Sequence, residues 1–86
     1  MLKEVVLAVP LEGHRIHIKF SDGLEGDVDF KDLAPFEGIF LPLQDKDLFA
    51  KLKVNRELGT IEWANGADIA PERLHELLKM KLASAA

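Results

Sequence analysis

A strict alternation of apolar and polar residues runs over residues 14–20 and again over residues 24–30. The apolar positions are Ile16, Ile18 and Phe20, followed by Leu24, Gly26, Val28 and Phe30. The charged or polar positions between them are Arg15, His17 and Lys19, followed by Glu25, Asp27 and Asp29. Because a period of two places successive side chains on opposite faces of a strand, the pattern predicts two strands, each with one buried face.

The segment Ser21-Asp22-Gly23 sets the register of these strands. A two-residue turn places acidic side chains opposite core residues, whereas a three-residue loop closed by Gly23 at positive φ aligns the two apolar faces. The predicted pairs are Phe20 with Leu24, Ile18 with Gly26, Ile16 with Val28, Lys19 with Glu25, His17 with Asp27 and Arg15 with Asp29. The last three pairs set basic side chains against acidic ones, which favours the same register.

An earlier strand is predicted over residues 3–9, with Val5, Leu7 and Val9 facing inward. A four-residue loop over residues 10–13 then sets Val9 against His14, Leu7 against Ile16 and Glu4 against Lys19. Residues 3–30 are thus expected to form a three-stranded antiparallel meander with a hydrophobic face that needs covering.

The second half of the chain supplies the expected cover. Residues 31–44 are interrupted by Pro35, Gly38 and Pro42 and predict an irregular but packed segment. Asp45 predicts the N-cap of a short helix ending near Lys53, residues 54–64 predict a second hairpin, and Asn65-Gly66 predicts a sharp turn. Pro71 opens a last helix with Leu74, Leu77, Leu78 and Leu82 on one side. The sequence therefore predicts one α+β domain over residues 1–86.

Composition narrows the classes of function. The net charge of −4 arises mainly from residues 21–47, where eight acidic residues outweigh two basic ones. An acidic chain without a basic run is not expected to bind nucleic acid directly. The chain has no cysteine and no long apolar run, so we expect a cytoplasmic protein without disulfides, a thiolate metal site or a membrane span.

Neither the acidic cluster nor the histidines predict catalytic or cofactor chemistry. Asp22, Asp27 and Asp29 lack the spacing of a calcium loop and are better explained as a salt-bridged sheet face. His17 beside Asp27 has no Ser, Cys or Thr placed to complete a triad. We therefore expect no enzyme, no metal and no cofactor.

The stretch from Trp63 to Asp68 is the most distinctive in the chain and has two interpretations. In one, Trp63 anchors the core and Gly66 supplies the positive φ of a tight turn. In the other, an exposed aromatic and polar rim binds a partner or ligand. The candidate interaction surface is formed by Phe36, Phe40, Trp63, Asn65 and Asp68.

Several motifs together resemble the bacterial family called domain of unknown function 2442, over about Val5 to Leu78. They are Phe20-Ser21-Asp22-Gly23, Val28-Asp29-Phe30, Pro42-Leu43 with Asp45 and Phe49, and above all the block from Ile61 to Pro71. Ala64 stands where members of that family often carry proline. The resemblance implies a small α+β domain of a family with suggested toxin–antitoxin associations, and it supplies no catalytic residues.

Two functional hypotheses follow. The first is a non-enzymatic protein–protein interaction or antitoxin-like accessory module, acting through its apolar surface on another protein or as a homodimer. The second is a small-ligand or enzymatic domain, in which Asn65, Asp68 and His75 converge on a cleft around Trp63.

Overall fold

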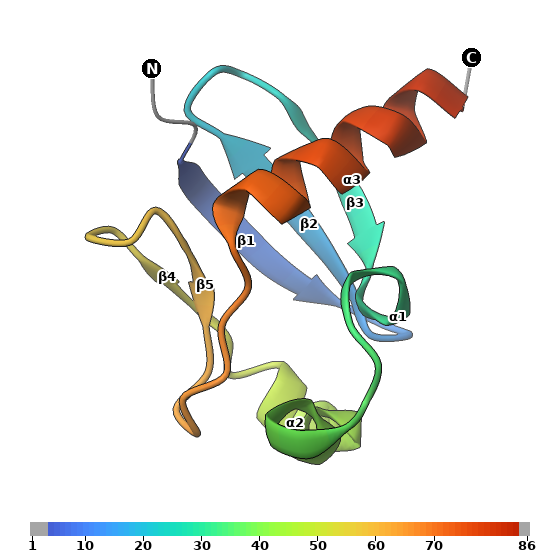
Figure 1. Ribbon diagram of the computed structural model, residues 1–86, viewed down its shortest axis with the longest axis vertical. Coiled ribbons are helices and arrows are strands. Elements are labelled where there is room, and N and C mark those ends of the chain that lie inside the picture. Colours follow the sequence, from blue (N-terminus) through green and yellow to red (C-terminus); the bar gives the residue numbers. More distant parts are fainter. Residues whose placement is uncertain (1–3, 85–86) are drawn as a thin grey trace.

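The computed structural model describes residues 4–84 (Figure 1). Its elements, in chain order, are β1 (Val5–Leu11), β2 (Arg15–Phe20), β3 (Glu25–Asp29), α1 (Phe30–Leu33), the 3₁₀ helix η1 (Gly38–Gln44), α2 (Lys46–Phe49), β4 (Lys53–Asn55), β5 (Thr60–Glu62) and α3 (Pro71–Ser84). Strands β1, β2 and β3 form an antiparallel meander, and β4 and β5 form a separate hairpin. The predicted α+β architecture is confirmed.

The β2–β3 hairpin has the predicted register at every position, from Lys19 opposite Glu25 to Arg15 opposite Asp29. Its loop is closed by a 3.0 Å hydrogen bond from the amide of Gly23 to the carbonyl of Phe20. Gly23 has φ of 93°, a conformation that only glycine adopts at no steric cost. The side chain of Asp22 accepts a hydrogen bond from the amide of Leu24, which fixes the turn further.

The predicted register of β1 is wrong by three residues, because Leu7 pairs with Lys19 and not with Ile16. The strand continues through Pro10 to Leu11, and the turn to β2 comprises residues 12–14 instead of 10–13. A bulge between Val5 and Leu7 reverses the alternation of side chains. Val5 therefore stays buried as predicted, whereas Leu7 and Val9 lie on the outer face of the sheet.

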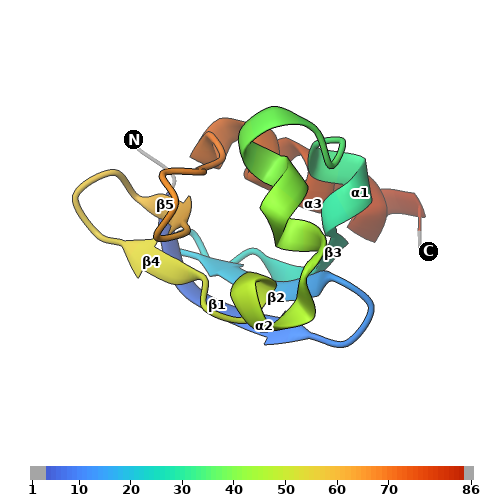
Figure 2. The same ribbon diagram turned by 90° about the horizontal axis from the view of Figure 1, so that it is seen from below.

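The core lies between the inner face of the sheet and the helices, which Figure 2 shows as two layers. Ile16, Ile18, Phe20 and Val28 are buried on the sheet side, as predicted. Leu74 and Leu78 are buried on α3, and each such side chain contributes about 1.5–3 kcal/mol relative to an exposed one. Leu82, predicted on the same apolar stripe, is 43% exposed because the end of α3 extends past the sheet (Figure 1).

The segment predicted to be irregular contains two short helices. Asp29 caps α1 by accepting a hydrogen bond from the amide of Lys31, and residues 38–44 form η1. Asp45 is the predicted N-cap of α2, but this helix ends at Phe49, earlier than predicted. These short turns hold aromatic rings around Phe30, whose ring centroid lies 5.3 to 5.8 Å from those of four neighbours. The four neighbours are Phe36, Phe40, Phe49 and Trp63.

The second hairpin and α3 agree with the sequence. The hairpin is tied to β1 by a 2.9 Å hydrogen bond from the amide of Val5 to the carbonyl of Gly59. Thr60 is buried and donates its hydroxyl to the carbonyl of Ile69, which holds the approach to α3 against β5. Gly66 has φ of 93° in the predicted turn, and Pro71 is the first residue of α3.

Candidate functional site

The outer face of the meander carries three columns of side chains of different character. Because register fixes which residues lie side by side, each row across the sheet contains one apolar, one basic and one acidic residue. The rows are Leu7–Lys19–Glu25, Val9–His17–Asp27 and Leu11–Arg15–Asp29. Sequence reasoning found the basic and acidic columns and missed the apolar one, because the bulge in β1 has no clear signature in the sequence.

The apolar column is open to solvent. Leu7 is 43% exposed and Val9 40% exposed. The helices α1 and α3 lie on the opposite face of the sheet, as Figure 2 shows. Covering apolar side chains on such a sheet face removes them from water and is therefore favourable.

His17 lies at the centre of this face and links two carboxylates. Its Nδ1 atom lies 2.6 Å from Oδ1 of Asp27, and its Nε2 atom lies 2.7 Å from Oε2 of Glu25. The hydrogen bonds to Glu25 and Asp27 raise the pKa of His17 above its ordinary value of 6.5. Because both ring nitrogens must carry a proton to donate to both carboxylates, the geometry favours the imidazolium form.

The ion pairs of this face differ in part from those expected from register. His17 binds Asp27 as predicted, but Glu25 turns diagonally to His17, although Lys19 lies opposite it. Asp29 has its salt-bridge contact with Lys31, at 3.8 Å. The acidic column of β3 thus remains exposed at Glu25 and Asp27, whose side chains are 44% and 45% accessible.

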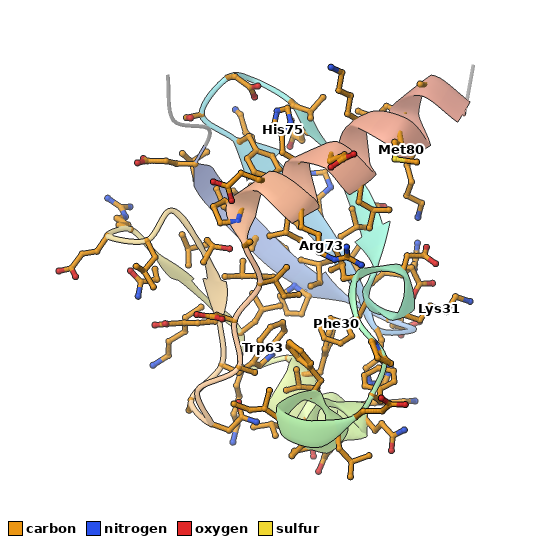
Figure 3. All side chains as sticks on the ribbon, in the orientation of Figure 1. Phe30, Lys31, Trp63, Arg73, His75 and Met80 are labelled. Atoms are coloured by element: carbon orange, nitrogen blue, oxygen red, sulfur yellow. The ribbon has the colours of Figure 1, made fainter. Side chains whose placement is uncertain are left out.

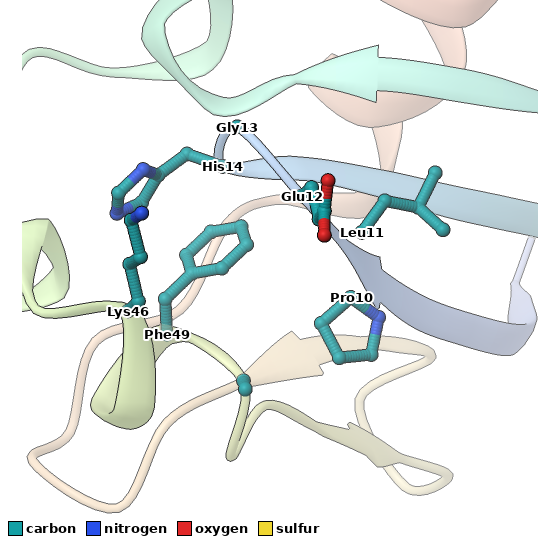
Figure 4. Close-up of a pocket in the computed structure, with 8 residues that line it drawn as sticks. Pro10, Leu11, Glu12, Gly13, His14, Lys46 and Phe49 are labelled. Carbon is teal, nitrogen blue, oxygen red and sulfur yellow. The ribbon is translucent and has the colours of Figure 1, made fainter.

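A hollow of about 520 Å³ lies at one end of the sheet, between the β1–β2 turn and α2 (Figure 4). His14 lines it and has φ of 56°, which is uncommon for a residue other than glycine. Its Nε2 atom lies 2.9 Å from the carbonyl oxygen of Leu43 and 3.0 Å from that of Gln44, so this nitrogen carries the proton and donates. The ring also packs against Phe49 at 4.8 Å, so His14 ties the turn to the end of η1.

The aromatic members of the predicted interaction surface belong to the core or its border. Trp63 is buried, and its indole nitrogen donates a 3.0 Å hydrogen bond to the carbonyl of Phe49. Phe36 and Phe40 are partly buried against the same cluster. The interpretation of Trp63 as part of an exposed rim is therefore wrong for this residue, because packing around Phe30 buries the indole.

The polar residues of the ligand hypothesis do not converge. Asn65 donates to the carbonyl of Ile39 at 3.0 Å, and Asp68 is exposed beside Glu62. His75 is 2.8 Å from Asp22 at the β2–β3 turn, and Figure 3 shows the two labelled side chains, His75 and Trp63, well apart. The predicted cleft around Trp63 is therefore not formed by these residues.

Residues 4–84 contain neither a cluster of metal-ligating side chains nor a helix that could span a membrane. In this part of the chain, no group of three or more histidine, aspartate or glutamate side chains is arranged to hold a metal ion. No helix within the same range has the length and apolar character required to cross a membrane.

Comparison with known proteins gives one match. A family model described as "Protein of unknown function (DUF2442)" matches residues 5–79. No curated protein and no solved structure matches the chain. The matched range begins with β1 and ends within α3, so it covers both the sheet and the helix that packs on it.

Proposed function

The chain belongs to the DUF2442 family of proteins of unknown function, and for this member we propose a non-enzymatic role as a protein–protein interaction domain. A partner protein docks on the outer face of the three-stranded sheet. The observation that carries this proposal is the exposed apolar column of β1, in which Leu7 and Val9 lie beside a basic and an acidic column.

The composition of this face supports docking of a protein. Protein interfaces combine an apolar centre with a polar rim whose charges set orientation and specificity. Here the apolar column lies along one edge strand, and His17 links the two charged columns by contacting both Glu25 and Asp27. A partner that covers Leu7 and Val9 therefore gains hydrophobic free energy without burying isolated charges.

The interaction surface predicted from the sequence offers less support. The predicted surface depended on Phe36, Phe40 and Trp63, and these rings pack on Phe30. A small-ligand or enzymatic role for the turn from Trp63 to Asp68 has no geometric support, because Asn65 and the indole of Trp63 make hydrogen bonds within the fold.

An antitoxin-like accessory role is one form of the proposed interaction, with a toxin as the docked protein. A homodimer is another, with a second copy as the partner. Both use the outer sheet face, and they differ in the mass of the complex.

Site-specific photocrosslinking in the native host cell tests the proposal. A photoreactive amino acid replaces Leu7 or Val9 on the outer face, and Leu58, exposed in the turn between β4 and β5, serves as the matched control. We expect one discrete crosslinked protein from positions 7 and 9, and none of that mass from position 58. Equal crosslinking from all three positions, or no crosslinking from positions 7 and 9, contradicts the proposal.

A second arm uses variants that remove the apolar side chains. Leu7→Ser and Val9→Ser together are expected to weaken capture of the crosslinked protein, whereas Leu58→Ser leaves it unchanged. Because all three side chains are exposed, these substitutions are expected to change the unfolding free energy by only about 0.5 kcal/mol each. Unchanged capture by the double variant would refute docking on this face.

A further inference from the structure

The two edges of the meander differ in whether a further strand is able to pair with them. Strand order places β1 and β3 at the edges. Phe20 donates to the carbonyl of Leu24, and Phe30 donates to that of His14, so hydrogen-bonded pairs of β2 and β3 recur at every second residue between these points. The even-numbered residues of β2 therefore direct their main-chain N–H and C=O groups toward β3. Its odd-numbered residues direct theirs toward β1.

This alternation closes the β1 edge. Ala8 and Pro10 are the residues of β1 whose main-chain groups point away from β2. Pro10 has no N–H to offer, and the amide of Val5 is already bonded to Gly59 of the second hairpin. Together with the bulge after Val5, these features oppose the addition of a strand at β1.

The same alternation leaves the β3 edge open. Glu25 and Asp27 face Lys19 and His17 as non-hydrogen-bonded pairs, so their N–H and C=O groups point out of the sheet. Strand β3 contains no proline and no bulge in its pairing with β2. Within residues 4–84, no strand pairs with this edge.

The helix α3 overhangs the open edge. A Cβ atom on Gly26 would lie 2.8 Å from Cδ1 of Leu78 and 3.4 Å from Cδ2 of Leu82, so α3 passes directly over β3. Beyond this crossing the last turns of α3 extend past β3, as the two views in Figures 1 and 2 agree. Leu82, one turn after Leu78 on this part of the helix, is 43% exposed. A strand beside β3 would cover part of this apolar surface.

We propose that the free edge of β3 accepts a fourth strand from a partner protein, an extended segment that alternates basic and apolar residues. This proposal rests on the protein-interaction role proposed above and identifies the kind of segment that docks. The basic side chains lie on the outer face beside Glu25 and Asp27, and the apolar ones lie on the inner face beneath Leu82.

A second copy of the chain is a poor occupant of this edge. Pairing β3 with β3 of another copy brings the acidic column, Glu25, Asp27 and Asp29, alongside itself. Like charges directly opposite each other on neighbouring strands are destabilising. Charge complementarity therefore selects a basic segment of a different protein.

Titration of the isotopically labelled full chain with synthetic peptides tests this proposal by NMR. The probe is a capped seven-residue peptide of alternating lysine and valine, and the control is its counterpart of alternating glutamate and valine. We expect the lysine peptide to shift the amide signals of Glu25, Gly26 and Asp27 and the methyl signals of Leu82. Shifts confined to other parts of the chain, or equal shifts with the glutamate peptide, overturn the proposal.

Two N-methylated peptides test main-chain pairing without changing the protein. Methylation of the lysine amides blocks an antiparallel added strand, because those amides face β3 in that arrangement, and methylation of the valine amides blocks a parallel one. We expect one of the two to bind about tenfold more weakly than the unmethylated peptide, since it loses two or three hydrogen bonds. Equal binding by all three peptides overturns strand addition.

A charge reversal identifies the edge. Asp27→Lys is expected to weaken binding of the lysine peptide about tenfold. Glu57→Lys, an equal change of charge in the exposed β4–β5 turn, is expected to leave binding within about twofold. Equal weakening by both variants would mean non-specific attraction and would overturn the proposal.

The two proposals fail separately. If the peptides do not bind while crosslinking from Leu7 and Val9 persists, strand addition at β3 is wrong and the interaction role stands. If the peptides bind and crosslinking fails, the outer face is not the docking surface.

Discussion

Replacing Trp63 with phenylalanine tests whether the indole is a core anchor held by one hydrogen bond. Trp63 is the only tryptophan of the chain and is 3% exposed. Its ring lies perpendicular to that of Phe30 at a centroid distance of 5.5 Å. A phenyl ring retains much of this edge-to-face contact, so the cost of the substitution comes from the lost hydrogen bond and from the smaller volume.

The expected loss of stability is the sum of a hydrogen-bond contribution and a cavity contribution. The carbonyl of Phe49 loses the indole donor but keeps a 3.3 Å hydrogen bond from the amide of Leu52, so this loss lies near the lower end of the usual range, about 1 kcal/mol. The void left by the smaller ring costs about 1 kcal/mol more. We therefore expect Trp63→Phe to lower the free energy of unfolding by about 2 kcal/mol, and the melting temperature by about 10 °C.

Urea unfolding followed by far-ultraviolet circular dichroism measures this change without relying on the missing indole. Benzothienylalanine at position 63 is the matched control, because sulfur replaces the N–H while the bicyclic shape is kept. It is expected to lose only the hydrogen-bond part, about 1 kcal/mol. A loss below about 0.5 kcal/mol for Trp63→Phe, or none for the isostere, would refute this account of the core. Crosslinking from Leu7 is expected to persist in the folded variant, since Trp63 lies in the core.

Three further predictions concern the sheet. Gly26→Ala is expected to lower the free energy of unfolding by about 1 kcal/mol because its Cβ would meet Leu78, and urea unfolding should show this cost vanishing when Leu78→Ala is also present. The His17 contribution to stability is full below pH 6.5 and is lost as pH rises through the raised folded-state pKa. Urea midpoints compared between pH 6 and pH 9 should therefore fall more in the native chain than in His17→Gln. Pro10→Val adds an outward N–H at the β1 edge and is expected to increase self-association in light scattering, whereas Pro35→Val in the exposed loop is not; equal masses for both would contradict a protective role of Pro10.

The candidate site was only partly predictable, because some of its columns are encoded locally and one depends on a distant contact. The basic and acidic columns follow from alternation and from the turn at Gly23, both of which are encoded within a few residues. The apolar column depends on the bulge after Val5, and that irregularity coincides with the hydrogen bond from Val5 to Gly59, more than fifty residues away. A pattern confined to β1 carries no information about such a contact.

The segment from Trp63 to Pro71 likewise combines features set by local residues with one set by distant contacts. Gly66 and Pro71 mark the turn and the helix start through their own backbone preferences, and the structure confirms both. Whether Trp63 faced the core or solvent depended on Phe30 and Phe49, which reach it from distant parts of the chain.

The sequence by itself determined the α+β class, the family, the β2–β3 register, and the opposition of acid to base across it. These features rest on residues close in the chain, where side-chain period and turn chemistry leave one consistent arrangement. The tertiary structure decided that Leu7 and Val9 face solvent, that Pro10 closes one sheet edge, and that α3 overhangs the other at Gly26. Each of these depends on contacts between distant segments, because packing and main-chain pairing are satisfied over the whole fold.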